Sequence, residues 1–134
     1  MRLYVGHSKD YDFKNSLYRP IRESLLNKAH TILLPHEHQD APFNSPELMK
    51  TIDLFIAEVS LPSIGLGIEL GWADRDKIPI AAVFRTGLKM GRSVQSLPTL
   101  IFSASYGNDA ELIQAIENSI LTMTQTGKWH DRAW

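Results

Sequence analysis

Short apolar runs alternate along this chain with longer segments whose apolar residues are three or four positions apart. The apolar runs resemble buried parallel strands and fall at residues 2–6, 30–36, 53–60, 78–84 and 98–105. The segments between them predict helices at residues 11–29, from Ser45 onward, at 67–77 and at 109–123. Strands that alternate with helices imply right-handed crossover connections. The pattern therefore predicts an α/β domain with a five-stranded, mostly parallel sheet and helices on both faces.

Individual residues refine this outline. Pro20 lies inside the first helical segment, so we expect that helix to be kinked or split. Ser45 and Pro46 are a typical helix cap and first-turn pair. The last helix should present one apolar stripe to the core, formed by Leu112, Ile113, Ile116, Ile120 and Leu121. Ligands of such sheets bind beyond the carboxyl ends of the strands, which directs attention to the loops at 6–11, 35–44, 60–67 and 85–95.

Composition narrows the class of protein. The chain has 134 residues, which suits one domain spanning 1–134. Its formal net charge of −1 argues against binding to nucleic acid. It contains no cysteine, which excludes disulfides and thiolate chemistry. No apolar stretch is long enough to cross a membrane and no signal peptide precedes the first strand, so we expect a cytoplasmic protein.

The turn "LPSIGLGIELGW" (residues 61–72) is the first candidate for chemistry. Gly65 and Gly67 would let backbone N–H groups approach an anion, and Ser63 could donate its hydroxyl or simply cap the helix. Glu69 would lean back toward the strand ends as a nucleophile, or be an ordinary first-turn acid. Tight packing between strand and helix would also account for the glycines.

Other polar residues lie in the loops. Ser8 and Lys9, after the first strand, could meet an anion. His36 and His38 have a spacing that can bind metal, but no third ligand is identifiable, so we predict neither a metal nor a cofactor.

The stretch "DLFIAEVSLPSIGLGIELGWA" (residues 53–73) resembles the central motif of the nucleoside 2-deoxyribosyltransferase superfamily. It is most similar to the 2'-deoxynucleoside 5'-monophosphate N-glycosidases, with the pattern D-V-V-V-A-E-V-T-Q-P-S-L-G-V-G-Y-E-L-G. The identical positions are Asp53, Ala57, Glu58, Val59, Pro62, Ser63, Gly65, Gly67, Glu69, Leu70 and Gly71. The start "LYVGHS" resembles the family's L-Y-F-C-G-S, which carries over Tyr4 and Ser8.

The resemblance implies a Rossmann/flavodoxin-like three-layer sandwich that cleaves the bond between deoxyribose and base, by hydrolysis or by transfer. Glu69 matches the nucleophile that forms a covalent glycosyl intermediate, and Tyr4 matches a tyrosine that positions it. Ser63 and Ser8 match contacts to the 5'-phosphate, with Lys9 as a nearby positive charge. The expected partner is a small nucleoside or nucleotide, bound by a homodimer or larger homo-oligomer.

One expected residue is missing. The family's acid that protonates the leaving base corresponds to Ser45 here, and serine cannot donate a proton usefully near neutral pH. Glu47, Asp40 and Glu37 are the alternatives nearby in the chain. Without such an acid, the alternative function is a non-catalytic nucleotide-binding or sensing domain on the same fold.

Two features complete the expectations. Asp53 and Glu58 match the motif, but we expect a structural role for Asp53. The aromatic C-terminal tail, residues 127–134, carries Trp129 and Trp134, which could dock onto this domain or take part in a dimer.

Overall fold

Five parallel strands form the centre of the computed structural model, which describes residues 1–38 and 45–126. Their order across the sheet is β2-β1-β3-β4-β5, and every neighbouring pair is parallel. The strands are β1 (Arg2–His7), β2 (Thr31–Leu33), β3 (Leu54–Glu58), β4 (Ile80–Arg85) and β5 (Leu100–Tyr106). The predicted α/β class and five-stranded sheet are confirmed, and the sheet is parallel throughout.

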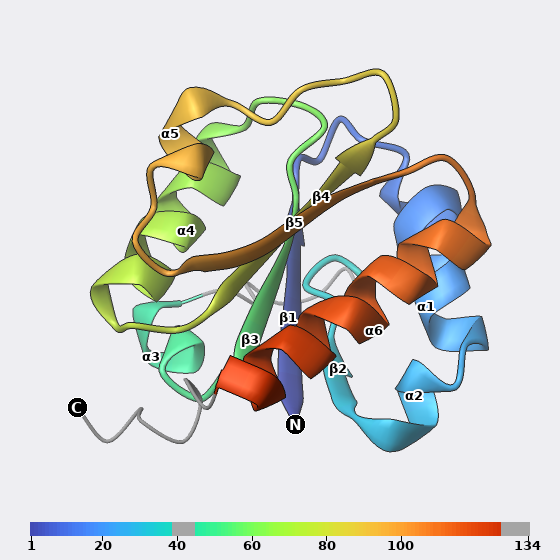
Figure 1. Cartoon of the computed structure of the whole chain (residues 1–134), viewed down its shortest axis with the longest axis horizontal. Coiled ribbons are helices and arrows are strands. Elements are labelled where there is room, and N and C mark those ends of the chain that lie inside the picture. The colour runs from blue at the N-terminus through green and yellow to red at the C-terminus, as the bar shows by residue number, and fades with distance from the viewer. Residues whose placement is uncertain (39–44, 127–134) are drawn as a thin grey trace.

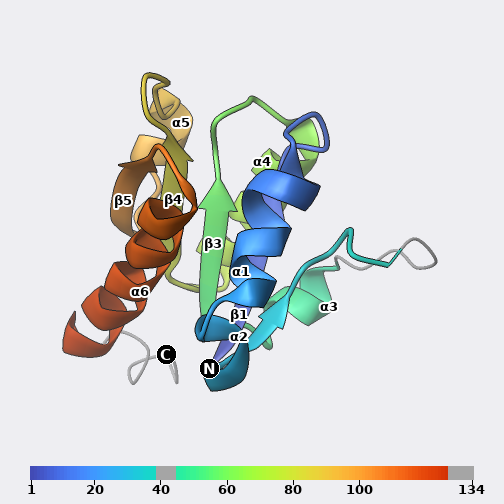
Figure 2. The same cartoon turned by 90° about the vertical axis from the view of Figure 1, so that its right-hand side faces the viewer.

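Helices cover both faces of this sheet, which gives three layers (Figure 1). One face carries α3 (Pro46–Met49), α4 (Ile64–Arg75) and α5 (Arg92–Gln95). The other carries the π-helical turn η1 (Lys14–Tyr18), α1 (Arg19–Glu23), α2 (Leu26–Ala29) and α6 (Asp109–Thr126). Turning the molecule by 90° shows α1 and α6 in front of the sheet and α4 behind it (Figure 2).

The core consists of two clusters, one on each face, because successive strand side chains point in opposite directions. Tyr4 and Phe55 belong to the cluster under α4, whereas Val5 and Ile56 belong to the cluster under α6. This alternation decides which side chains of each strand can reach which layer of helices. It therefore brings Tyr4 to the α4 side.

Several local predictions can be compared with the structure. The first helical segment is split as expected, into η1, α1 and α2, and Pro20 is the second residue of α1, directly after the π-helical turn. Ser45 caps α3 as expected: its Oγ accepts a hydrogen bond of 3.0 Å from the N–H of Leu48. The loop expected at 85–95 ends instead in the short helix α5, which begins after Gly91. Leu121 was expected in the apolar stripe of α6, but it is 54% exposed.

Gly6 lies where β1 passes close to Phe55 and to α4. A Cβ atom at this position would lie 2.6 Å from the Phe55 ring and 2.9 Å from Leu66 of α4. No larger residue fits without displacing one of them. The backbone of β1 can therefore pass close to the N-terminal half of α4 at this point.

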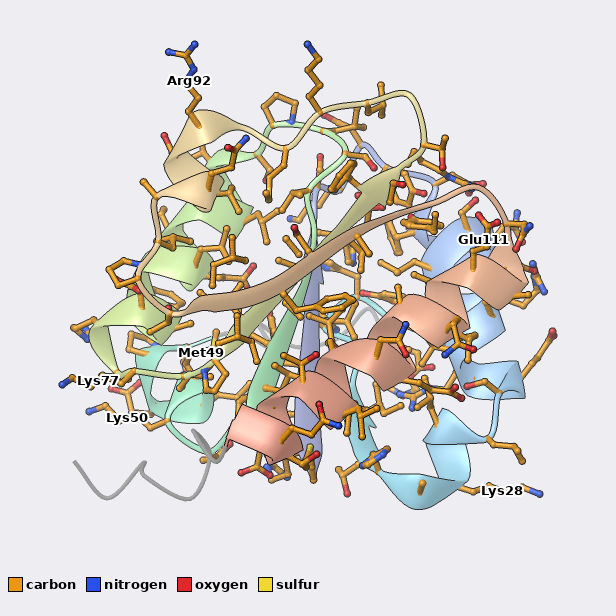
Figure 3. The ribbon with its side chains drawn as sticks, in the orientation of Figure 1. Lys28, Met49, Lys50, Lys77, Arg92 and Glu111 are labelled. Carbon is orange, nitrogen blue, oxygen red and sulfur yellow. The ribbon has the colours of Figure 1, made fainter. Side chains whose placement is uncertain are left out.

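Charged side chains are spread over the outside. Lys28, Lys77 and Arg92 extend outward in Figure 3, whereas the labelled Met49 is fully buried. Within the described residues, no helix is long and apolar enough to cross a membrane. Asp40, Trp129 and Trp134 lie outside the described residues, so the expectations about them remain untested.

Candidate active site

A cavity of about 570 Å³ opens where the strand order changes direction, beyond the carboxyl ends of β1 and β3. Because β1 continues to β2 on one side and β3 to β4 on the other, the loops after β1 and β3 diverge and leave a crevice. A volume of this size suits a small organic ligand. The cavity is lined by His7, Ser8, Lys9, Asp10, His36, Pro62, Ser63, Ile64, Gly65, Leu66 and Glu69.

Glu69 lies in the second turn of α4 and is almost completely buried, at 5% exposure. The hydroxyl of Tyr4, itself fully buried in β1, donates a short hydrogen bond to Oε2 of Glu69. Burial and the nearby carboxylate raise the pKa of Tyr4 well above its usual value, so the phenol stays a donor. The result is a single carboxylate held in a fixed orientation in the wall of the cavity.

The opening of α4 supplies groups suited to an anion. Ser63 caps the helix, since its Oγ accepts a hydrogen bond of 3.3 Å from the N–H of Leu66. Accepting this bond leaves the hydroxyl proton free to be donated elsewhere. Ile64 and Gly65 occupy the first helical positions, whose N–H groups have no partner within the helix, and both line the cavity. The capping interpretation of Ser63 is correct and is compatible with binding an anion.

The loop after β1 faces these groups across the cavity. Ser8 is buried, and its Oγ accepts a hydrogen bond of 3.1 Å from the N–H of Asp10. Lys9 and Asp10 are both exposed at the cavity and carry opposite charges. Ser8 and Lys9, predicted from the loop after the first strand, thus line the same cavity as Ser63.

The two glycines of the turn differ in position. Gly65 lines the cavity, whereas Gly67 is not in its lining. A Cβ on Gly67 would meet no atom within 4 Å, and one on Gly65 would meet only Ser63 Oγ, at 3.9 Å. Tight packing against the strand therefore does not account for either glycine.

An aromatic cluster at the cavity was not predicted from the sequence. His7 stacks on Phe13 with ring centroids 4.5 Å apart, and His36 meets His7 edge-on at 5.3 Å. Nδ1 of His7 donates to the carbonyl oxygen of Ser8 at 2.8 Å, so Nε2 is the acceptor of the hydrogen bond from Tyr18 at 2.6 Å. The Tyr18 oxygen in turn accepts from the N–H of His36 at 3.0 Å.

Burial disfavours the charged form of both histidines. Desolvation lowers the pKa of His7 to about 4. Desolvation, followed by the positive charge of Lys9, also lowers the pKa of His36. These residues come from the end of β1, the start of η1 and the loop after β2, so the one signal in the sequence was a histidine close to the end of each of the first two strands.

Two of the three candidate acids, Glu37 and Glu47, lie outside the cavity of Glu69, and the third, Asp40, is not among the described residues. Both carboxylate oxygens of Glu37 bind Arg22 at 2.8 Å, and this pairing lowers the pKa of Glu37. Glu37 lines a second, smaller cavity of about 220 Å³ with Lys14, Tyr18, Arg19, Arg22 and His36. Glu47 is in the first turn of α3 and interacts electrostatically with Arg75 at the last turn of α4. Neither glutamate lines the cavity of Glu69.

The two remaining acids of the motif have structural partners. Asp53 accepts a hydrogen bond of 2.8 Å from the backbone N–H of Arg2 at the start of β1, in agreement with the structural role expected for it. Glu58 is buried on the α6 side of the sheet, where it accepts hydrogen bonds from Tyr106 and from the N–H of Ser60. Among the described residues, no group of three or more His, Cys, Asp or Glu side chains could hold a metal ion.

Fold and site together define an α/β protein with a buried carboxylate and a serine-capped helix start at the switch point of the sheet. A curated relative is the "Putative 2'-deoxynucleoside 5'-phosphate N-hydrolase 1" of Syntrophotalea carbinolica, 35% identical over 74 residues. That match covers 54% of this chain and 51% of the relative, so the chain matches about half the relative's length. No family model matches the chain.

Solved structures share the fold. The CMP N-glycosidase BcmB of Clostridium botulinum superposes with a TM-score of 0.61 at 20% identity, over 87% of this chain and 99% of that one. A conserved protein of Enterococcus faecalis gives 0.56 at 17% identity, over 88% and 98%. The constitutive lysine decarboxylase of E. coli gives 0.54 at 20% identity, over 98% of this chain but 18% of that one. These structures show the fold, and the name of the curated relative agrees with the resemblance of residues 53–73 to the 2'-deoxynucleoside 5'-monophosphate N-glycosidases.

Proposed function

We propose that this protein cleaves the N-glycosidic bond of a nucleoside or 2'-deoxynucleoside 5'-monophosphate, with Glu69 as the nucleophile. The observation that carries the proposal is the cavity that Glu69 lines together with Ser8, Lys9 and Ser63, whose polar groups could bind a phosphate. A nucleotide needs both kinds of group, because its phosphate and its anomeric carbon are separated by the sugar. The names of the sequence relative and of one structural neighbour point to the same reaction.

The spacing along α4 fits this substrate. Ser63 and Glu69 are six residues apart, which corresponds to about 9 Å along a helix. The Glu69 side chain leans toward the N-terminus of its helix, which shortens that separation. A phosphate at the start of α4 would thus leave the sugar beside the carboxylate.

The proposed chemistry has two steps. A carboxylate oxygen of Glu69 attacks C1', the bond to the base breaks, and its electron pair leaves with the base. Tyr4 keeps the carboxylate aimed at C1' through its hydrogen bond. Water in hydrolysis, or a second base in transfer, then attacks C1', and the bond from C1' to Glu69 breaks with its electron pair returning to the carboxylate.

The test is to incubate the purified protein with a panel of nucleosides, 2'-deoxynucleosides and their 5'-monophosphates and to measure free base. We expect release from at least one monophosphate and none from a Glu69→Gln variant. Adding a second free base distinguishes the two outcomes of the intermediate, because only transfer yields a new nucleoside. Base release by Glu69→Gln at the rate of the unmodified protein would refute the proposal.

A second candidate is a non-catalytic nucleotide-binding domain. The hydroxyl of Ser45, at the position of the family's acid, is engaged in capping α3. Thermal stabilisation by nucleotides without release of base from any of them would favour this function over the enzyme.

We also propose a cytoplasmic homodimer. Nucleoside monophosphates are metabolites of the cytoplasm, which supports the location. Ile64 and Ile68, one turn apart on α4, are 87% and 49% exposed beside the cavity and offer an apolar surface to a second copy. Light scattering of the purified protein measures the oligomeric state, and a monomer at all concentrations would exclude the dimer.

A further inference from the structure

The proposed reaction requires a proton for the leaving base, and the cavity itself limits which group can supply it. Among the described residues, the titratable groups that line it, apart from Glu69, are His7, Lys9, Asp10 and His36. Both ring nitrogens of His7 are engaged, one with Ser8 and one with Tyr18. Lys9 lies beside Ser8, where the phosphate is expected. Asp10 is exposed in the same short loop.

His36 differs from these residues in its environment. Its ring is half-buried, and within the described residues no hydrogen bond to either ring nitrogen occurs. Its backbone N–H is bound to the hydroxyl of Tyr18, and its ring packs against those of His7 and Phe13. The ring is thus held at the cavity with nitrogens available to a ligand.

The position of His36 also fits the base end of a nucleotide. It lines both the cavity of Glu69 and the smaller cavity beyond. Ser63 and the start of α4 occupy the anion-binding end of the same cavity. His36 thus lines the cavity in which a nucleotide with its sugar at Glu69 must also place its base.

We propose that His36 is the catalytic residue that protonates the leaving base, in place of the acid that Ser45 does not provide. This inference rests on the proposed function. As Glu69 forms its bond to C1' and the bond from C1' to the base breaks, the imidazolium of His36 transfers its proton to the base nitrogen or a conjugated oxygen. In the second step the neutral imidazole accepts a proton from the attacking water, and the ester to Glu69 breaks.

The charges around His36 determine when it can act. The groups that face it or line its two cavities are His7, Lys9, Lys14, Tyr18, Arg19, Arg22, Glu37, Asp10 and Glu69. Burial and Lys9 lower the pKa of His36, whereas a bound phosphate would offset the charge of Lys9. The protonated form is therefore lost as the pH rises, and kcat/KM for a nucleotide should fall with it.

A comparison of two leaving groups tests the proposal. One substrate is a 2'-deoxynucleoside 5'-monophosphate from which the unmodified protein releases base. The other is 4-nitrophenyl 2-deoxyriboside 5-phosphate, whose nitrophenolate departs without being protonated. General acid catalysis typically contributes about 10²–10⁴-fold. We expect His36→Gln to lower kcat for the nucleotide by about 100-fold or more and to leave nitrophenolate release within a few-fold.

Controls separate this role from a structural one. His38→Gln makes the same change two residues along the loop, where the side chain is 88% exposed, and should leave both substrates unaffected. The loss of kcat/KM with rising pH should disappear in His36→Gln and with the nitrophenyl substrate. Circular dichroism of each variant verifies folding.

The outcomes are distinguishable. Equal losses on both substrates, or a nucleotide rate unchanged in His36→Gln, would overturn the role of His36 while leaving Glu69 as nucleophile. A nucleotide-specific loss in Asp10→Asn and none in His36→Gln would assign the proton to Asp10 instead. If the unmodified protein cleaves neither substrate, the proposed function fails, and the role of His36 fails with it.

Discussion

Replacing Tyr4 with phenylalanine should separate the stability of this site from its chemistry. The change removes one oxygen atom, which donates a hydrogen bond to Glu69. Tyr4 is fully buried and Glu69 is 5% exposed, so water cannot easily replace the lost donor. The ring can keep its position against Phe55, with centroids 5.1 Å apart, because phenylalanine has nearly the same shape.

The expected loss of stability in Tyr4→Phe follows from the hydrogen bond that is removed. A hydrogen bond to a charged group contributes about 1.5–3 kcal/mol. For a domain of this size, that loss corresponds to a Tm lower by on the order of 5–15 °C. Loss of the fixed carboxylate orientation should lower kcat by about 10- to 100-fold, since catalysis by proximity is sensitive to small displacements.

The assay combines thermal unfolding with base release from a nucleotide. Tyr11→Phe is the matched control, because its hydroxyl binds Tyr106 and Arg85 at 2.5 and 2.8 Å instead of Glu69. That variant should lose stability but keep kcat close to that of the unmodified protein. If Tyr4→Phe retained both its Tm and its kcat, the hydrogen bond to Glu69 would have no role in stability or in catalysis.

Three further predictions concern the cavity and its surroundings. Ser63→Ala should raise KM about tenfold for a 5'-monophosphate, because a hydrogen bond to a charged group is lost, and should leave KM for the unphosphorylated nucleoside unchanged. Ser45→Ala removes the corresponding cap of α3 and serves as the control for the loss of a helix cap. Equal effects of Ser63→Ala on both substrates would contradict phosphate binding. Gly6→Ala should lower the free energy of unfolding in urea by about 1–3 kcal/mol because its Cβ would overlap Phe55, whereas Gly71→Ala, with open space around the new Cβ, should raise it by up to about 1 kcal/mol. Burial lowers the pKa of His7 to about 4, so as the pH falls below about 6.5 the unfolded chain takes up a proton on His7 before the folded protein does. This difference lowers the free energy of unfolding by up to about 1.4 kcal/mol per pH unit between these two pKa values. The fall in the free energy of unfolding between pH 6.5 and 4.5, measured in urea, should therefore be smaller in His7→Gln, and an equal fall would refute the argument.

Local sequence patterns predicted the strands and the turn that carries Ser63 and Glu69. Apolar runs located all five strands, and the turn at residues 61–72 pointed to Ser63 and Glu69 because glycine, a cap and an acid occur at helix-start spacing. By contrast, α5 has four residues and too little periodicity to be recognised. Leu121 was misassigned because its spacing suits the stripe of α6, but the tertiary packing leaves it exposed.

Long-range contacts were beyond the reach of these patterns. Glu37 pairs with Arg22, 15 positions away in the sequence. Glu37 is therefore in an ion pair, although its neighbour in the sequence, His36, lines the cavity. The cluster of His7, Phe13 and His36 forms because three segments meet at the carboxyl end of β1. Neither arrangement has a signature within a single segment.

The structure contains two buried glutamates that each accept a hydrogen bond from a buried tyrosine, and the sheet explains why their roles differ. Glu69 with Tyr4 lies on the α4 face, beside the cavity, whereas Glu58 with Tyr106 lies on the α6 face. The two oxygens of Glu58 bind the N–H of Ser60 and the hydroxyl of Tyr106, and Glu58 does not line the cavity of Glu69. Burial and a tyrosine partner are therefore insufficient to identify a nucleophile. The opening between the diverging loops after β1 and β3 distinguishes the candidate nucleophile from the structural carboxylate.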